Sequence, residues 1–111
     1  MTRIIDLKGL TRGDTIAFYV KGKNVTRNIV NAYFSVKVNK NDTEYVLQKT
    51  LNVGITELEQ GLYSVEIVPS DTNDLTLGVY WYDLQLDFGN NNIITPMKGV
   101  FELTYDITRE L

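Results

Sequence analysis

The chain has 111 residues, a formal net charge of −3 and a hydrophobic fraction of 43%, which is the size and composition of one globular domain. It contains neither cysteine nor histidine, so disulfides, thiol and imidazole nucleophiles and ordinary zinc sites are excluded. The acidic balance also argues against nucleic acid or an anionic membrane as the partner. We therefore expect a single domain over residues 1–111 with no cofactor, no nucleic acid and no membrane partner.

Apolar residues alternate with polar ones along most of the chain, which is the pattern of half-buried strands. Turn-forming segments separate these runs at intervals of about ten residues, as in an antiparallel sandwich or barrel. Single helical turns are expected at most at 55–60 and at 70–75, after Pro69. Both prolines, Pro69 and Pro96, fall at predicted joints, where no ladder hydrogen bond is needed. The predicted strands are 4–7, 15–20, 29–38, 45–53, 62–68, 79–88 and 99–107.

The strand 79–88 has the clearest alternation in the chain. Successive side chains of a strand point to opposite faces, so one set should be buried and the other set should face water. The last strand is expected to place Phe101 and Leu103 beside the buried set. The buried set is Tyr80, Tyr82, Leu84, Leu86 and Phe88, and the outer set is Trp81, Asp83, Gln85 and Asp87.

Carboxylates are the residues that raise the question of metal binding or catalysis. Asp71, Asp74, Asp83 and Asp87 lack the alternating Asp/Asn, Gly and Glu spacing of an EF-hand loop, so we interpret them as turn-stabilising or solvated residues. The chain has no glycine-rich phosphate loop and no nucleophile elbow. We therefore predict no metal ligands, no catalytic residues and no enzymatic activity.

Three aromatic residues lie on the less apolar faces of their predicted strands: Tyr19, Tyr33 and Trp81. One interpretation is that a loop or the N-terminal segment covers them. Another is a protein–protein contact, because aromatic residues are enriched at the anchors of interfaces. A third is a stacking platform for a carbohydrate or a peptide. We take the three residues as candidate partner contacts.

The tripeptide Arg12-Gly13-Asp14 matches an integrin-binding motif. A glycine that turns the chain into the strand beginning at Thr15 explains the same residues, and we predict such a turn. The N-terminal residues also lack the apolar run of a signal peptide. We therefore expect the chain to be made in a cytoplasm.

Several short motifs occur in an order that resembles small tail-associated and baseplate proteins of phages infecting Gram-positive bacteria, including the N-terminal domain of baseplate upper proteins. The motifs are Arg12-Gly-Asp-Thr15, Ala32–Lys37, Gly61–Leu75, Gly78–Leu84 and Gly99–Thr108. The resemblance implies an immunoglobulin-like β-sandwich without catalytic residues. It also implies a structural or accessory role in the virion, with tail or baseplate proteins or further copies of the chain as partners. A carbohydrate- or peptide-binding module remains the alternative function.

Overall fold

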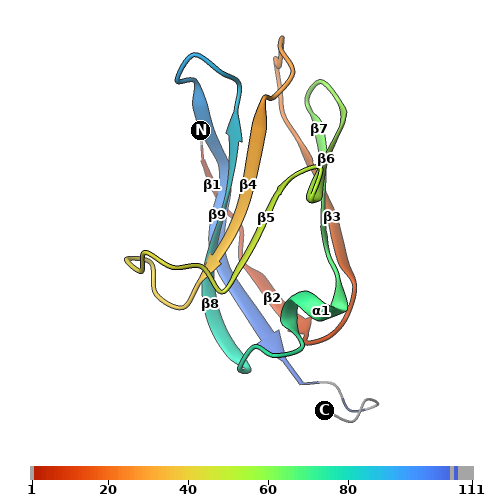
Figure 1. The fold of residues 1–111 in the computed structure, drawn as a ribbon, viewed down its shortest axis with the longest axis vertical. Helices are drawn as coiled ribbons and strands as arrows, with labels where there is room; N and C mark the ends of the chain where they lie inside the picture. Colours follow the sequence, from red (N-terminus) through yellow and green to blue (C-terminus); the bar gives the residue numbers. More distant parts are fainter. Residues whose placement is uncertain (1, 106, 108–111) are drawn as a thin grey trace.

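The computed structural model describes residues 2–105 and 107, and within them the chain forms nine strands and one short helix (Figure 1). The all-β prediction is confirmed, whereas the expected number of about seven strands was too low. The elements are β1 (Arg3–Ile4), β2 (Leu7–Thr11), β3 (Ile16–Lys21), β4 (Asn31–Lys37), β5 (Leu47–Leu51), β6 (Gly54–Glu59), β7 (Leu62–Ile67), α1 (Pro69–Thr72), β8 (Gly78–Asp87) and β9 (Ile93–Thr104).

The strands form one curled sheet in the order β1-β9-β8-β4-β5-β6-β7-β3, with β2 also paired to β9. Its two halves face each other across the core, and the sheet bends between β5 and β6 (Figure 1). Most neighbouring strands are antiparallel, but β1 and β2 run parallel to β9, and β5 runs parallel to β6. The sheet is therefore mixed, which corrects the purely antiparallel expectation.

The alternation read from the strand 79–88 is confirmed in β8, where all five predicted inward residues are buried. Phe101 and Leu103 of β9 are buried beside them, also as predicted. The fully buried ring of Phe34 lies at the centre of this core. Its centroid is 5.8 Å from that of Phe18, 5.4 Å from Tyr82 and 6.2 Å from Phe101, distances at which aromatic rings attract each other.

Near the ends of the strands, several residues predicted on apolar faces are exposed in the structure. The alternation of the predicted strands 29–38 and 45–53 put Val38 and Tyr45 on the apolar faces. However, 48% and 50% of their surfaces are exposed, because both lie in the β4–β5 loop outside the paired segments. Val30 and Val53 are exposed for the same reason. In β5 the inward position between Leu47 and Leu51 belongs to Lys49. Its ammonium forms an ion pair of 2.6 Å with Asp71 of α1.

Three predicted joints are strands. Residues 7–11 form β2, and residues 54–59 form β6 rather than a loop or helical turn. β9 begins at Ile93, so Pro96 lies inside a strand and not at a joint. The register of β8 and β9 shifts between Leu84 and Leu86 at this point, and such a bulge tolerates a residue without an N–H.

The helical turn predicted after Pro69 is confirmed, whereas the end of the last strand differs from the prediction. The expected helical turn after Pro69 is α1, and Asp71 accepts a hydrogen bond of 2.8 Å from the Val68 N–H at its start. The last strand was predicted to reach residue 107 but ends at Thr104. Asp106, which was part of that predicted strand, and Thr108, the last residue of the Gly99–Thr108 motif, lie outside the described residues.

The segment Arg12–Asp14 forms the predicted turn between β2 and β3. The Arg12 guanidinium donates a hydrogen bond of 3.0 Å to the Leu75 carbonyl, and the N–H of buried Gly13 donates one of 2.8 Å to the Thr72 hydroxyl. These contacts attach the turn to α1 and the loop after it, so the tripeptide supports the fold rather than projecting from it.

Candidate functional site

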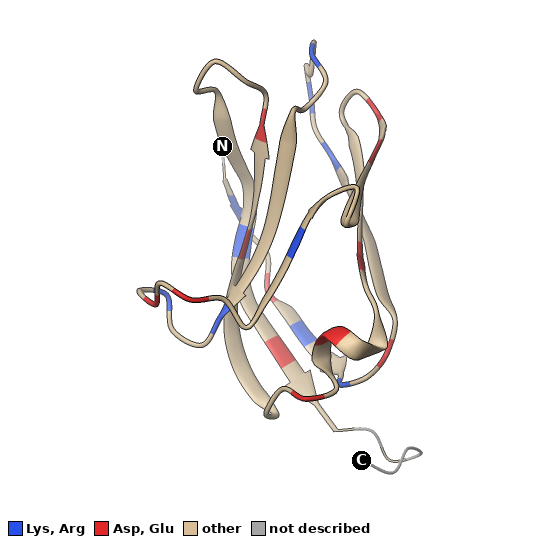
Figure 2. Cartoon of the chain, in the orientation of Figure 1, with Lys and Arg blue, Asp and Glu red and all other residues tan. Residues whose placement is uncertain are grey.

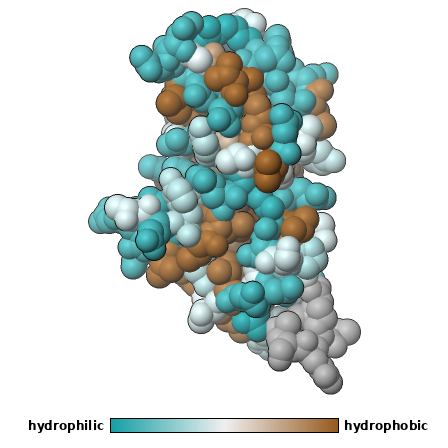
Figure 3. Space-filling view, in the orientation of Figure 1, coloured by the Kyte–Doolittle hydropathy of each residue, from teal (hydrophilic) through white to brown (hydrophobic). Residues whose placement is uncertain are grey.

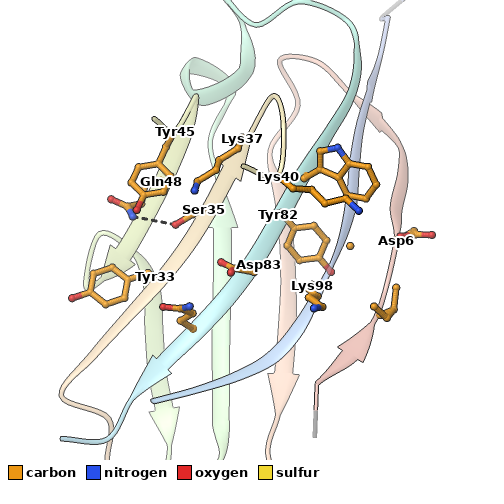
Figure 4. Close-up of a pocket in the computed structure, with 14 residues that line it drawn as sticks. Asp6, Tyr33, Ser35, Lys37, Lys40, Tyr45, Gln48, Tyr82, Asp83 and Lys98 are labelled. Carbon is orange, nitrogen blue, oxygen red and sulfur yellow. Dashed lines mark hydrogen bonds between the residues drawn. The ribbon is translucent and has the colours of Figure 1, made fainter. Parts of the chain in front are cut away.

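One outer face of the curled sheet carries a polar row that crosses four strands. Gln48 of β5 lies opposite Ser35 of β4, Ser35 lies opposite Asp83 of β8, and Asp83 lies opposite Lys98 of β9. The Gln48 amide donates a hydrogen bond of 3.0 Å to the Ser35 hydroxyl (Figure 4). Because neighbouring strands lie about 4.8 Å apart, the row presents hydrogen-bonding groups at short and regular intervals.

Aromatic residues lie on both sides of this row. Tyr33 is two positions from Ser35 on β4, and Trp81 is two positions from Asp83 on β8, in the opposite direction along the sheet. We name the surface formed by Tyr33, Ser35, Gln48, Trp81, Asp83 and Lys98 the groove. With its neighbours it encloses a hollow of about 810 Å³, within the range of small-molecule sites.

Lysines from β4 and from the loop after it cover the aromatic rings at the rim of the groove. The Lys40 ammonium lies 4.3 Å from the centroid of the Trp81 ring, and the Lys37 ammonium lies 5.3 Å from that of Tyr45. Both distances allow a cation–π interaction. Lys37 also donates a hydrogen bond of 2.6 Å to the Asp42 carbonyl, which fixes the loop over this side of the groove.

Asp83 is the half-buried carboxylate at the centre of the groove. Burial raises the pKa of this carboxyl above its usual value, and the positive charges of Lys37 and Lys98 act in the opposite direction. A carboxylate kept among aromatic and amide groups gives up hydration, and such positions recur at binding and catalytic sites. The same group can accept hydrogen bonds from a ligand.

The N-terminal segment forms the wall of the groove beyond β9. The Tyr82 hydroxyl donates to the Ile5 carbonyl, and an Asp6 carboxylate oxygen accepts a hydrogen bond of 3.0 Å from the Val100 N–H. Gly99 makes this approach possible, because a Cβ there would lie 2.6 Å from the Ile5 oxygen. Burial, with a smaller contribution from Asp6, raises the pKa of Tyr82 to about 12.

The second outer face, formed by β3, β6 and β7, is built differently. Its exposed side chains include Tyr19 at 73% exposure and Leu58 at 50%, which line a smaller hollow of about 370 Å³. β3 is the last strand in the order and pairs only with β7 among the strands of the described residues. Acidic residues lie along the β6–β7 hairpin, whereas β9 and the β4–β5 loop carry residues of both signs (Figure 2).

The structure thus brings two of the three candidate contact residues together. Trp81 and Tyr33 both line the groove, whereas Tyr19 lies on the other half of the sheet. The N-terminal segment lies beyond β9 and covers neither residue, and both Trp81 and Tyr33 are partly exposed. Sequence reasoning missed Tyr45, Gln48 and the lysines of the groove. The alternation of the strands placed Gln48 on the outer face, but only the register between strands shows that it meets Ser35.

Apolar side chains are visible in separate patches with hydrophilic residues between them in the space-filling view (Figure 3).

No cluster of three or more potential metal ligands occurs among the described residues. In the same part of the chain, no helix has the length and apolar character needed to cross a membrane. No protein-family model matches this chain, and no curated protein matches it.

Proposed function

We propose that this chain is a non-enzymatic structural or accessory component of a phage virion, a docking or assembly domain of the tail or baseplate. Its partners are tail or baseplate proteins or further copies of itself. The observation that carries the proposal is the outer edge of β3, which pairs with no strand of the described residues and whose Tyr19 ring is exposed. The ordered motifs that resemble phage tail proteins supply the context.

The strand order supports an immunoglobulin-like sandwich as the architecture of such a domain. β9, β8, β4 and β5 make one half, and β6, β7 and β3 make the other. In a seven-stranded immunoglobulin-like domain, the third, sixth and seventh strands share one sheet, as β4, β8 and β9 do here. The second and fifth strands are neighbours on the other sheet, as β3 and β7 are here. The parallel β1 and β2 extend the first half at its edge.

An edge strand is a natural place for assembly, because its free N–H and C=O groups can pair with a strand from another chain. β3 is six residues long, and Ala17, Tyr19 and Lys21 on its outer face are exposed. A single lysine at its end is the only charge within the strand, so little opposes pairing along the rest of it. The aromatic ring of Tyr19 would add apolar contact area to such a strand addition.

The test uses particles of the phage whose genome encodes this chain. Purified virions probed with an antibody against the chain should contain it, and its absence from them would refute the proposal. Virions assembled with Tyr19→Lys should hold fewer copies than virions assembled with Tyr105→Lys. Tyr105 is a matched control because 65% of its surface is exposed, beyond the end of β9. Equal incorporation of both variants would show that the β3 edge is not the surface that contacts the partner.

A further inference from the structure

The groove is a second surface, on the half of the sheet opposite β3, and its chemistry differs from that of a protein contact. Its floor is made of hydrogen-bonding side chains, with amides at Gln48 and Gln85, a hydroxyl at Ser35 and a carboxylate at Asp83. The floor therefore offers both donors and acceptors. Aromatic rings border the floor on both sides, at Tyr33 and at Trp81.

We propose that the groove binds a short saccharide chain, with sugar rings against Trp81 and Tyr33 and sugar hydroxyls on the polar row. A sugar ring has C–H groups that pack on an aromatic face and hydroxyls that both donate and accept at its edge. The alternation of aromatic and polar residues in the groove matches these two sets of groups. The hollow of about 810 Å³ is large enough for more than one small-molecule-sized unit.

A peptide is a poorer fit to this surface. Peptides that bind to sheets commonly add a strand to a free edge, but the floor strands β4 and β8 are each paired on both sides. An apolar peptide side chain would also have to cover the row from Gln48 to Lys98, and burying such polar groups without new hydrogen bonds is costly. Hydroxyl groups of a saccharide can hydrogen-bond to the exposed members of this row.

The electrostatics of Asp83 support the same occupant. Its carboxylate is partly dehydrated, and burial raises its pKa, so a ligand that donates hydrogen bonds to it would restore what burial removes. Lys37, Lys40 and Lys98 surround the groove, and none of them forms an ion pair within the part of the chain that the structure describes. They can contact an acidic sugar, and Lys40 moves off the face of the Trp81 ring when a sugar ring packs against that face.

The experiment measures the binding of defined oligosaccharides to the full chain by titration calorimetry. The probes are tetrasaccharides of glucose, of N-acetylglucosamine and of a uronic acid. At least one should bind, and Trp81, the only tryptophan of the chain, should change its fluorescence on binding. Preference for the uronic acid with strong salt dependence would place its carboxylate on the lysines. Preference for a neutral probe would show that the lysines make no ionic contact with the ligand.

Two variants test the two parts of the site. Trp81→Ala and Asp83→Asn should each weaken binding by about tenfold or more, the loss expected for one aromatic or charge-assisted contact. Tyr19→Ala is the matched control, since it removes an exposed aromatic ring from the other half of the sheet, and its affinity should equal that of the parent chain. Circular dichroism of each variant verifies that it is folded.

Absence of binding by all three tetrasaccharides would overturn the proposal, and so would affinity that Trp81→Ala and Asp83→Asn leave unchanged. Binding of a peptide pool in the groove, displaced by no saccharide, would assign the surface to a peptide instead. Saccharide binding is a function separate from the docking role, because the groove lies on the half of the sheet opposite β3. A chain that is absent from virions but binds sugar refutes the first proposal alone, and a virion component without sugar affinity refutes the second alone.

Discussion

The two outer faces of the curled sheet come from the same kind of sequence pattern but differ in construction. On the groove face, β4, β8 and β9 are 7, 10 and 12 residues long, and β4 and β8 are paired on both sides. Outward side chains such as Ser35 and Asp83 therefore stand in fixed rows. On the other face, β3, β6 and β7 have six residues each, and Tyr19 borders a smaller hollow of about 370 Å³. The greater length of β8 and β9 gives the groove face room for the larger composite site.

The largest expected effect tests whether the groove face depends on the core beneath it. Leu84→Ala should lower the free energy of unfolding by about 2–5 kcal/mol, because the side chain is fully buried and its loss leaves a cavity. Urea denaturation measures the difference. Leu58→Ala on the other face is the control, and it should change stability by no more than about 0.5 kcal/mol because the side chain is half exposed. Similar losses for the two variants would abolish the contrast between the halves.

The second prediction concerns the N-terminal wall that only the groove face has. Gly99→Ala should cost about 1–3 kcal/mol, since the new methyl would overlap the backbone of Ile5. Gly78→Ala is the matched control: its φ of +146° is close to the +158° of Gly99, but a Cβ there meets no atom within 4 Å. The excess loss in Gly99→Ala, measured by thermal unfolding, reports the contact with Ile5. No excess would mean that the wall is not held in this position.

A third test titrates the hydrogen bond between that wall and β8. The pKa of Tyr82 is raised to about 12 from a usual value of 10.0, so folding favours the protonated phenol. Its contribution to stability is therefore complete below pH 10 and is lost as the pH rises toward about 12. Tyr82→Phe should be less stable at pH 7 by about 1 kcal/mol and should lose less stability between pH 10 and about 12.

Leu58→Ala is the comparison for this alkaline titration, because Leu58 is half exposed and carries no titratable group. Its stability should fall with pH as steeply as that of the parent chain. Urea denaturation at a series of alkaline pH values gives both curves. Parallel curves for Tyr82→Phe and the parent would argue against the bond to Ile5.

The smallest effect is expected at Asp83, in the centre of the groove. Burial raises the pKa of this carboxyl, so the charged form destabilises the folded state relative to the neutral form, and the cost appears as the pH rises through that pKa. Asp83→Asn should therefore be as stable as the parent chain or slightly more stable at pH 7. At acidic pH, where the parent carboxyl is protonated, the two should converge. A marked loss at pH 7 would mean that Asp83 serves the fold rather than a ligand.

The sequence predicted the parts of the fold that depend on local alternation. β4, β7 and β8 have strong alternation, and their inward residues, such as Phe34 and Val65, are buried as expected. β6 was missed because Glu57 and Glu59 lie in a short strand that follows a glycine, a pattern equally typical of a loop. β9 was begun too late because Pro96 was interpreted as a strand end. Neither the bulge at Pro96 nor the parallel pairing of β2 has a local signal.

Only part of the candidate site could be predicted from the sequence. Trp81 and Tyr33 were identified because each is an aromatic residue at an outward position of a regular strand. Tyr45 was predicted on an apolar face, since its alternation continues that of Leu47 although the strand does not extend so far. The row from Gln48 to Lys98 depends on the register of four strands. Register follows from the packing of the whole sheet, so no short segment of the sequence encodes it.

The parallel pairing of the first strands with the last one has a kinetic consequence. Leu10 and Thr104 are bonded across 94 positions of sequence, and Tyr82 reaches Ile5 across 77. Closing such long loops before their contacts form is slow, so proteins rich in distant pairings fold slowly. The strands β3 to β8 can assemble while the chain emerges during synthesis. β1 and β2 find their partner only after residues 97–104 have appeared. The wall of the groove is therefore expected to be the last part of the sheet to form.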